Sequence, residues 1–235
     1  ESGQRLYDYA NTVLSEYDKL KKEIDMIRAS EEGTVELLVA YDILRYLTPD
    51  CILEFQKKYP NVTFSYMEYP DRIVEKMLLD KEGNVALSIG PFAGDCFDMK
   101  SLKKCSLGLL VYEEHSLAKK REATILDLEG EPLYLENSSF KLNEFIQSRC
   151  WNRGFEPDIV FETNGFDLCY KMCRLKRGIS VTIDFVHEDM NTEGLVMIPF
   201  AEDDMIWEIG LLTLKDRAME SSVEKFYKYI ENYNS

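Results

Sequence analysis

The first thirty residues place apolar side chains at steps that alternate between four and three residues. These positions are Leu6, Ala10, Val13, Tyr17, Leu20, Ile24 and Ile27. A heptad pattern of this kind is typical of a helix that buries one narrow stripe against another helix. It predicts a linker or dimerisation helix over residues 1–30, and packing of the same stripe on the chain's own body is the alternative.

From Gly33 onward, short apolar runs alternate with amphipathic segments. Strands are predicted at residues 35–41, 62–69, 85–90, 105–115, 131–137, 158–164, 179–184, 195–200 and 207–214. Helices are predicted at residues 51–59, 71–83, 140–154, 166–178 and 221–233, the first of them capped by Thr48. Strands separated by helices favour right-handed crossovers and a parallel sheet, so the fold class is α/β. The pattern occurs twice, which predicts two lobes with a ligand cleft beyond the carboxyl ends of the strands.

Composition and charge narrow the possible partners. The chain has 235 residues, of which 45% are hydrophobic and 30% are charged, and its formal net charge is −15. It is expected to be globular, and so acidic a body without a basic stripe is repelled by phosphate backbones. No apolar run approaches the roughly 20 residues that span a bilayer, and no secretion signal precedes the first helix. We therefore expect a cytoplasmic protein with no membrane partner.

Few residues suggest covalent or metal chemistry. The six cysteines are irregularly spaced without a CxxC motif, and the pair Cys169 and Cys173 has no histidine near it in sequence. Free thiols are therefore favoured over a disulfide or a metal site. The GxSxG, P-loop and HExxH motifs are absent, so no enzyme activity, catalytic residue, metal or cofactor is predicted.

Four segments, taken in order, resemble one protein family. They are the helix over residues 3–27, "FQKKYPNVTFSYMEY" (55–69), "LVYEEHSLAKKREATILDLEGEPLYL" (110–135) and "RLKRGISVT" (174–182). Their order and spacing resemble the linker helix and effector-binding part of LysR-type transcriptional regulators. The chain departs from the family pattern at Ser116 and Ile183, where proline is usual, at Ala86, where aspartate is usual, and at Lys176, where glycine is usual. These departures do not change the expected fold. They do mean that the binding pocket is not expected to have the same residues as the pocket of a known member.

The resemblance implies a two-lobed, periplasmic-binding-protein-like (type 2) fold preceded by a linker helix. It implies a first lobe at residues 34–112 and 206–235 and a second lobe at residues 115–200. A small-molecule effector would bind between the lobes of a homo-oligomer, a dimer or tetramer. DNA would be met only through a winged helix-turn-helix head that this sequence lacks. The alternative function is a solute-binding protein of a transport system.

Residues that match the family's effector-binding positions follow predicted strand ends. They are Tyr41, Asp42, Ile43, Asn137, Ser138, Ser139, Thr163, Asn164, Gly165 and Thr182. Hydroxyl and amide groups beside a helix N-terminus suit a carboxylate or phosphate, while Ser138 or Ser139 can equally serve as the cap of its own helix.

Asp42 adds a hypothesis about the charge of the effector. A ligand carboxylate about 4 Å from an unpaired Asp42 would meet roughly 1 to 4 kcal/mol of repulsion. We therefore expect a cationic or hydrogen-bond-donating end of the ligand to face Asp42, unless Arg45 pairs with that carboxylate.

Overall fold

The computed structural model describes residues 33–92 and 94–233, together with seven positions near the N-terminus. Those seven are Tyr9, Val13, Leu14, Glu16, Tyr17, Lys19 and Leu20, and all are helical. Their apolar members leave 55–76% of their surface exposed. The described part of the predicted stripe is therefore not covered by the rest of the chain. Leu6, Ala10, Ile24 and Ile27 lie outside the described residues.

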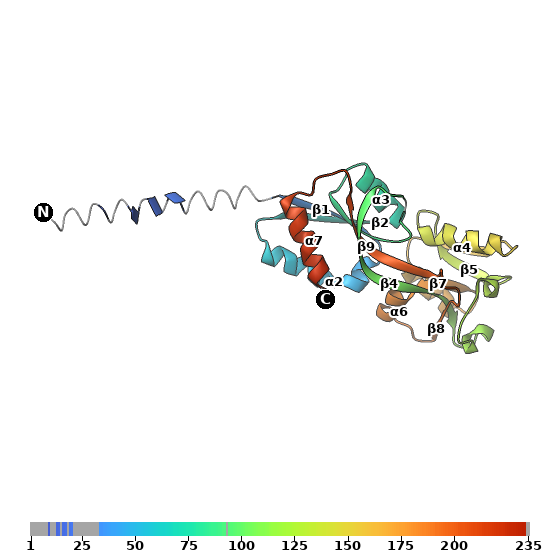
Figure 1. Cartoon of the computed structure of the whole chain (residues 1–235). Coiled ribbons are helices and arrows are strands. Elements are labelled where there is room, and N and C mark those ends of the chain that lie inside the picture. The colour runs from blue at the N-terminus through green and yellow to red at the C-terminus, as the bar shows by residue number, and fades with distance from the viewer. Residues whose placement is uncertain are drawn as a thin grey trace.

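Nine strands and six helices form the described body, with two short 3₁₀ turns between them (Figure 1). The strands are β1 (Thr34–Ala40), β2 (Thr63–Tyr69), β3 (Val85–Ile89), β4 (Phe97–Tyr112), β5 (Pro132–Glu136), β6 (Asp158–Thr163), β7 (Ile179–Ile183), β8 (Leu195–Pro199) and β9 (Ile206–Leu214). The helices are α2 (Ile43–Lys58), α3 (Asp71–Leu79), α4 (Lys141–Asn152), α5 (Phe166–Arg174), α6 (Asp184–Asp189) and α7 (Ser221–Tyr233). The sequence periodicity thus predicted most of the strands and helices, because most of them bury one apolar face.

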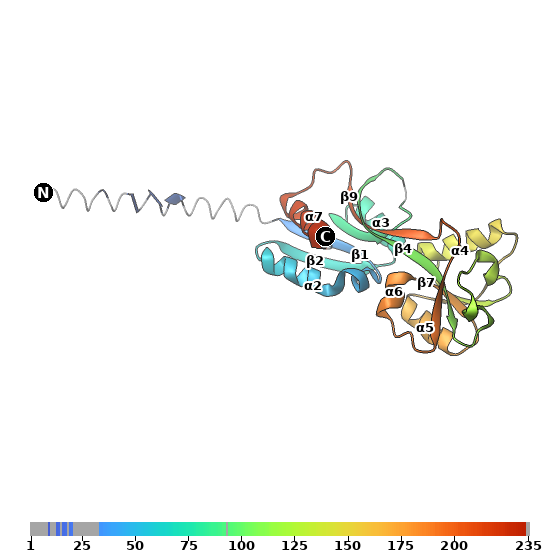
Figure 2. The ribbon, with the colours of Figure 1, turned by 60° about the horizontal axis from the view of Figure 1, so that its bottom comes forward.

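The strands form one continuous ladder in the order β2-β1-β3-β9-β4-β7-β5-β6, with β8 also paired to β4. The long strand β4 joins two sheet regions, because residues 97–106 pair with β9 whereas residues 107–112 pair with β7 and β8. We call the part with β1, β2, β3 and β9 the first sheet, and the part with β5, β6, β7 and β8 the second sheet. Helices α2, α3 and α7 pack on the first sheet, and α4, α5 and α6 pack on the second. Figure 2 shows the two bodies side by side, with β4 running between them.

The prediction of a parallel sheet is wrong in part. Strand β1 runs parallel to β2 and β3, and β5 runs parallel to β6 and β7. However, β9 is antiparallel to β3 and β4, and β4 is antiparallel to β7 and β8. The first part of β4 was not predicted because its residues alternate among lysine, serine and aspartate rather than forming an apolar run. Local periodicity does not encode the point at which the chain passes from one sheet to the other, because that point depends on tertiary packing.

The beginning of α2 also differs from the prediction. The helix begins at Ile43, and it is interrupted at Thr48, whose φ of 60° and ψ of 146° are not helical. Proline at position 49 disfavours the helical conformation in the residue before it, which accounts for the break. The predicted helix start therefore corresponds to the second segment of a kinked helix.

The lobe boundaries at residues 34–112, 115–200 and 206–235 stay a prediction. The change of pairing partner within β4 falls between Ser106 and Leu107, before the crossing expected near residue 112. Among the described residues, no helix combines the length and apolarity needed to cross a membrane.

Candidate functional site

Two adjacent hollows lie where helices and loops of the two sheets meet. The inner one is a cavity of about 20 Å³, which we call the inner cavity. It is lined by Ala40, Tyr41, Asp42, Ile43, Asp71, Ile89, Glu136, Phe140, Phe166, Ile183, Phe185 and Trp207. The outer one, the cleft mouth, holds about 510 Å³ and is lined by Tyr41, Asp42, Leu44, Arg45, Thr48, Pro49, Glu68, Asn164, Gly165, Asp167 and Asp189. Tyr41 and Asp42 line both hollows, so the two are adjacent.

Strand ends supply both hollows. Strand β1 ends at Ala40, and Asp42 follows with a left-handed φ of 68° that turns the chain into α2. In the second sheet, β5 ends at Glu136 and β6 ends at Thr163. The carboxyl ends of parallel strands meet at one edge, which is where open α/β sheets bind ligands.

Five of the ten predicted site residues line these hollows. Tyr41, Asp42 and Ile43 line the inner cavity, and Asn164 and Gly165 line the cleft mouth with Tyr41 and Asp42. The predicted site was assigned to strand ends of both lobes, and the hollows indeed draw residues from both sheets. Whether these residues bind an effector stays a prediction.

Four of the other five predicted residues, all except Ser138, make local hydrogen bonds. The Asn137 side chain accepts a hydrogen bond from the Ser139 amide at 2.9 Å and donates one to Asn164. Thr163 is buried, and its hydroxyl lies 3.4 Å from the carbonyl of Gly165. Thr182 is also buried, and its hydroxyl shares a 3.0 Å hydrogen bond with Tyr170. These groups brace the loops of the second sheet.

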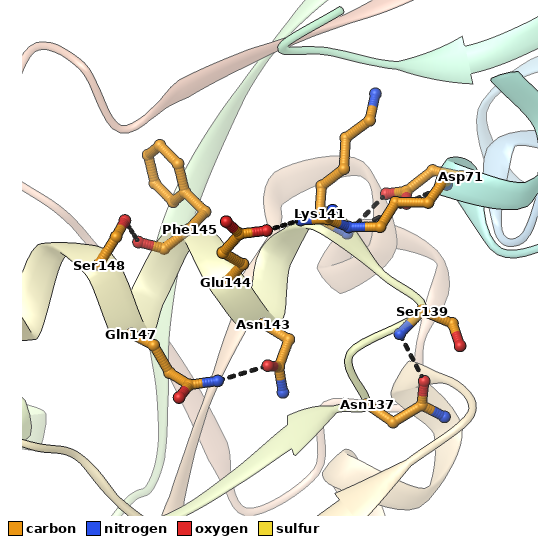
Figure 3. Close-up of polar contacts among 10 residues, drawn as sticks. Asp71, Asn137, Ser139, Lys141, Asn143, Glu144, Phe145, Gln147 and Ser148 are labelled. Atoms are coloured by element: carbon orange, nitrogen blue, oxygen red, sulfur yellow. Dashed lines mark hydrogen bonds and ion pairs between the residues drawn. The ribbon is translucent and has the colours of Figure 1, made fainter. Parts of the chain in front are cut away.

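The expectation that Ser138 or Ser139 caps α4 is wrong. The cap position is Phe140, which has no side-chain cap. Instead, Asp71 of α3 accepts a hydrogen bond from the Lys141 amide at 3.0 Å, as Figure 3 shows. The carboxylate that satisfies the start of α4 thus comes from the other sheet's helix, which no local sequence signal could reveal.

Arg45 forms ion pairs with three carboxylates of the cleft mouth. Its guanidinium donates to Asp42, to Asp167 at 2.8 Å and to Asp189 at 2.6 Å. Asp167 lies on α5 and Asp189 on α6, so a residue of the first sheet's helix is bound to two helices of the second. The pairing of Arg45 with Asp42 is the exception that the sequence hypothesis named, so Asp42 alone no longer argues for a cationic ligand.

Sequence analysis missed three groups of the inner cavity, namely Asp71, Glu136 and Trp207. Glu136 is only 4% exposed, and no described group donates a hydrogen bond to its carboxylate. Burial, with the nearby charges of Asp42 and Asp71, raises the pKa of Glu136 well above its usual value. Burial also raises the pKa of Asp71 to about 6, although the charge of Lys141 acts against this shift. The one available signal was an acid that ends the otherwise apolar run "PLYLE".

A separate hollow of about 560 Å³ lies between α3 and α4, and none of the predicted residues lines it. Its charged groups are largely matched, since Arg72 pairs with Glu144 and the Lys141 ammonium pairs with Glu75 and with the Ile89 carbonyl. Figure 3 shows Glu144, Phe145 and Ser148 along this face of α4.

The remaining candidate chemistry is absent from the described residues. All six cysteines are free, and burial raises the pKa of Cys51 and Cys105 to about 12. No group of three or more metal-ligating side chains is found in the part of the chain that the structure describes. Hollows lined from two sheets that β4 joins fit the two-lobed, periplasmic-binding-protein-like fold that the family resemblance implied.

Comparisons with known proteins place the chain more narrowly. The family model for the LysR substrate binding domain matches residues 28–234, so the chain belongs to that family. It is 25% identical over 185 residues to the uncharacterized HTH-type transcriptional regulator YwbI of Bacillus subtilis, covering 79% of this chain and 62% of that protein. It is 23% identical over 235 residues to the transcriptional dual regulator GltC of the same organism, covering 99% of this chain and 78% of GltC.

A solved structure agrees on the fold. The regulatory domain of CcmR from Synechocystis PCC6803, solved in complex with 2-PG, superposes with a TM-score of 0.77 at 16% identity. The match covers 86% of this chain and 98% of that one. At this level of identity the likeness establishes the fold alone.

Proposed function

We propose that this chain is the ligand-sensing part of a LysR-type transcriptional regulator, working in the cytoplasm. The observation that carries the proposal is the family match over residues 28–234, combined with a cleft at the strand ends of both sheets. Several relatives are described as HTH-type transcriptional regulators, and the CcmR domain was solved with a small molecule bound. These descriptions support a regulator over the alternative, a solute-binding protein of a transport system.

The proposed mechanism is a shift between two arrangements of the lobes. The effector enters the cleft mouth and contacts Tyr41, Asp42, Asn164 and Gly165, with Asn137, Ser138, Ser139 and Thr163 as supporting loop residues and Thr182 behind them. It changes the separation of the lobes only as far as it binds one arrangement more tightly than the other, at about 1.4 kcal/mol per tenfold difference in affinity. An oligomer formed through the N-terminal helix and the lobes would carry that change to a DNA-binding head. The role is regulatory rather than catalytic.

Gly165 offers a test of the binding site. A side chain added at this position would meet no atom within 4 Å, and its φ of 172° is open to any residue. A Gly165→Phe variant should therefore fold normally while its ring fills the cleft mouth. Asn152→Phe, exposed at the end of α4, is the matched control.

Native mass spectrometry of the purified chain is the measurement. We expect a co-purified small molecule that Gly165→Phe loses and Asn152→Phe retains. Equal retention by both variants would show that the cleft is not the binding site. The regulatory step is tested with the full-length protein on DNA upstream of its own gene. An electrophoretic shift that is indifferent to the released compound would contradict the sensor role.

A further inference from the structure

The inner cavity combines two buried polar groups that have no partner among the described residues. Glu136 is 4% exposed, and its carboxylate receives no hydrogen bond. Trp207 is 3% exposed, and its indole Nε1 has no acceptor. Buried polar groups are normally hydrogen-bonded, and one left unpaired costs on the order of the full desolvation of that group. Both residues line the inner cavity, and the buried carboxylate of Glu136 there calls for a molecule that supplies a hydrogen-bond donor.

The charge around the two hollows has one dominant sign. Six carboxylates line them, those of Asp42, Glu68, Asp71, Glu136, Asp167 and Asp189. Among the described lining residues, the guanidinium of Arg45 is the one cationic group. It is already shared among Asp42, Asp167 and Asp189. Asp71 instead accepts from the backbone amides of Arg72 and Lys141 and lies near the Lys141 charge, whereas Glu136 has neither kind of compensation. A cleft walled by one sign of charge concentrates ligands of the opposite sign.

The walls of the inner cavity are otherwise apolar and largely aromatic. Phe140, Phe166 and Phe185 are each at least 96% buried there, beside Ile43 and Trp207. Aromatic faces attract cations as well as apolar groups. The described residues contain no cluster of metal-ligating side chains, which favours an organic cation over a metal ion.

We propose that the effector carries a cationic nitrogen, an ammonium, amidinium or guanidinium, on an apolar group, and that the nitrogen binds between Glu136 and Asp71. This inference rests on the proposed function, and it names the chemical class of the ligand. The cation replaces the missing hydrogen-bond donors of Glu136 and offsets the repulsion among the buried carboxylates.

The ligand reaches this position only when the lobes separate. A cavity of about 20 Å³ holds a single water molecule. One water could bridge Glu136 and Trp207, but it carries no charge and leaves the repulsion between carboxylates in place. Binding of the cation therefore requires the bodies of the two sheets to move apart beside the cleft mouth, and the cation favours that opened arrangement.

Three probes of one shape separate the possible charges, namely benzamidine, benzamide and benzoate. By isothermal titration calorimetry at neutral pH and millimolar concentration, we expect benzamidine to bind at least roughly tenfold more tightly than either of the others. Glu136→Gln should weaken benzamidine roughly tenfold or more, and Asp71→Asn should weaken it in the same direction. Glu156→Gln removes the same charge from an exposed position and should leave the affinity unchanged.

A linked proton measurement gives an independent readout. Because the buried carboxyls must ionise to bind the cation, wild-type protein should release protons on binding benzamidine near pH 6, seen as a heat that differs between two buffers. Glu136→Gln should release fewer. Thermal melting of every variant, measured first, shows that each is folded.

Tighter binding of benzoate than of benzamidine would overturn the proposal, as would equal benzamidine affinity for wild type and Glu136→Gln. Absence of saturable benzamidine binding would also count against it. The proposed function fails separately, since an anion or a neutral compound that co-purifies with the chain and is lost in Gly165→Phe would leave the sensor role standing.

Discussion

At the scale of single residues, Glu136 is the least expected group in the molecule. A glutamate on a buried strand is tolerated when it is neutral, paired or functional, since an isolated buried charge shifts its pKa instead of remaining ionised. Glu136 has no partner, and the charges of Asp42 and Asp71 both disfavour its ionisation. The ionised form of Glu136 is thus unfavourable at the position where the inferred cation would compensate its charge.

This arrangement predicts how stability depends on pH. The folded-state pKa of Glu136 and of Asp71 lies above the unfolded value, so folding takes up protons. The stability that these groups contribute is present at low pH and is lost as the pH rises through about 6, the pKa of Asp71. At neutral pH, Glu136→Gln should raise the free energy of unfolding by about 1–3 kcal/mol, and the gain should shrink toward about pH 5.

Urea unfolding followed across this pH range checks the expectation. Glu156→Gln is the control, because a chain with a net charge of −15 gains something from the loss of any carboxylate. The groups that face the Glu136 carboxyl are Asp42 at the start of α2 and Asp71 on α3, and both act in the same direction. If both variants gain the same free energy of unfolding, the gain comes from the reduced net charge and not from the cavity.

At the scale of secondary-structure elements, contacts between helices hold the two sheets' bodies against each other. Arg45 on α2 binds α5 and α6, and Lys103 on β4 lies 3.8 Å from Glu188 on α6. On the other side, Asp71 of α3 accepts from the first amide of α4, and Lys141 reaches Glu75. Two groups of contacts therefore hold the bodies of the two sheets together, one through α5 and α6 and one between α3 and α4. Residues near both groups line the inner cavity.

A double-mutant cycle measures how strongly Arg45 and Asp42 stabilise each other. Arg45→Met should lower the free energy of unfolding by about 1–3 kcal/mol, because it leaves the carboxylate of Asp42, which is largely buried, without its donor. In an Asp42→Asn background the same change should cost only about 0–1 kcal/mol, since Asp167 and Asp189 are largely exposed. Urea unfolding of the four proteins gives the coupling energy. Equal losses in both backgrounds would mean that Asp42 does not depend on Arg45.

At the scale of the whole molecule, the described helical positions near the N-terminus expose apolar side chains to solvent. Val13, Tyr17 and Leu20 are helical and expose 62%, 63% and 55% of their surface on this single chain. Apolar residues at heptad spacing are normally covered by another helix. A second copy of the chain is the partner that the proposed regulator would supply.

Assembly can be tested on the described positions of the stripe. Val13→Asp combined with Leu20→Asp should convert a dimer or larger assembly to monomers, because each buried aspartate would be an unpaired charge. Lys19→Glu, on the same helix but off the stripe, should leave assembly unchanged. Light scattering after size-exclusion chromatography reports the mass. A double aspartate variant that keeps the wild-type mass would place the interface on the lobes instead.

Local chemistry by itself determined most of the elements. Most strands and helices of the body have a sequence period or a capping signal that follows from burying one face, so β1, α3, α5 and α7 fall within a few residues of their predicted bounds. The first part of β4 and the short helix α6 were not predicted. The family resemblance proposed Tyr41, Asp42 and Gly165 as site residues, and they line the cleft mouth because loops that follow parallel strands meet at one edge. The order of motifs was also enough to identify the family.

Tertiary structure alone decided how those elements combine. The antiparallel insertion of β9, the passage of β4 between sheets and the capping of α4 by Asp71 all join residues far apart in the chain. The isolation of Glu136 and Trp207 depends on which groups surround them after folding, and the acid that ends the run "PLYLE" is the one local sign of it. Periodicity reports which face a residue turns inward, whereas the partner it meets there is fixed only when distant segments pack together.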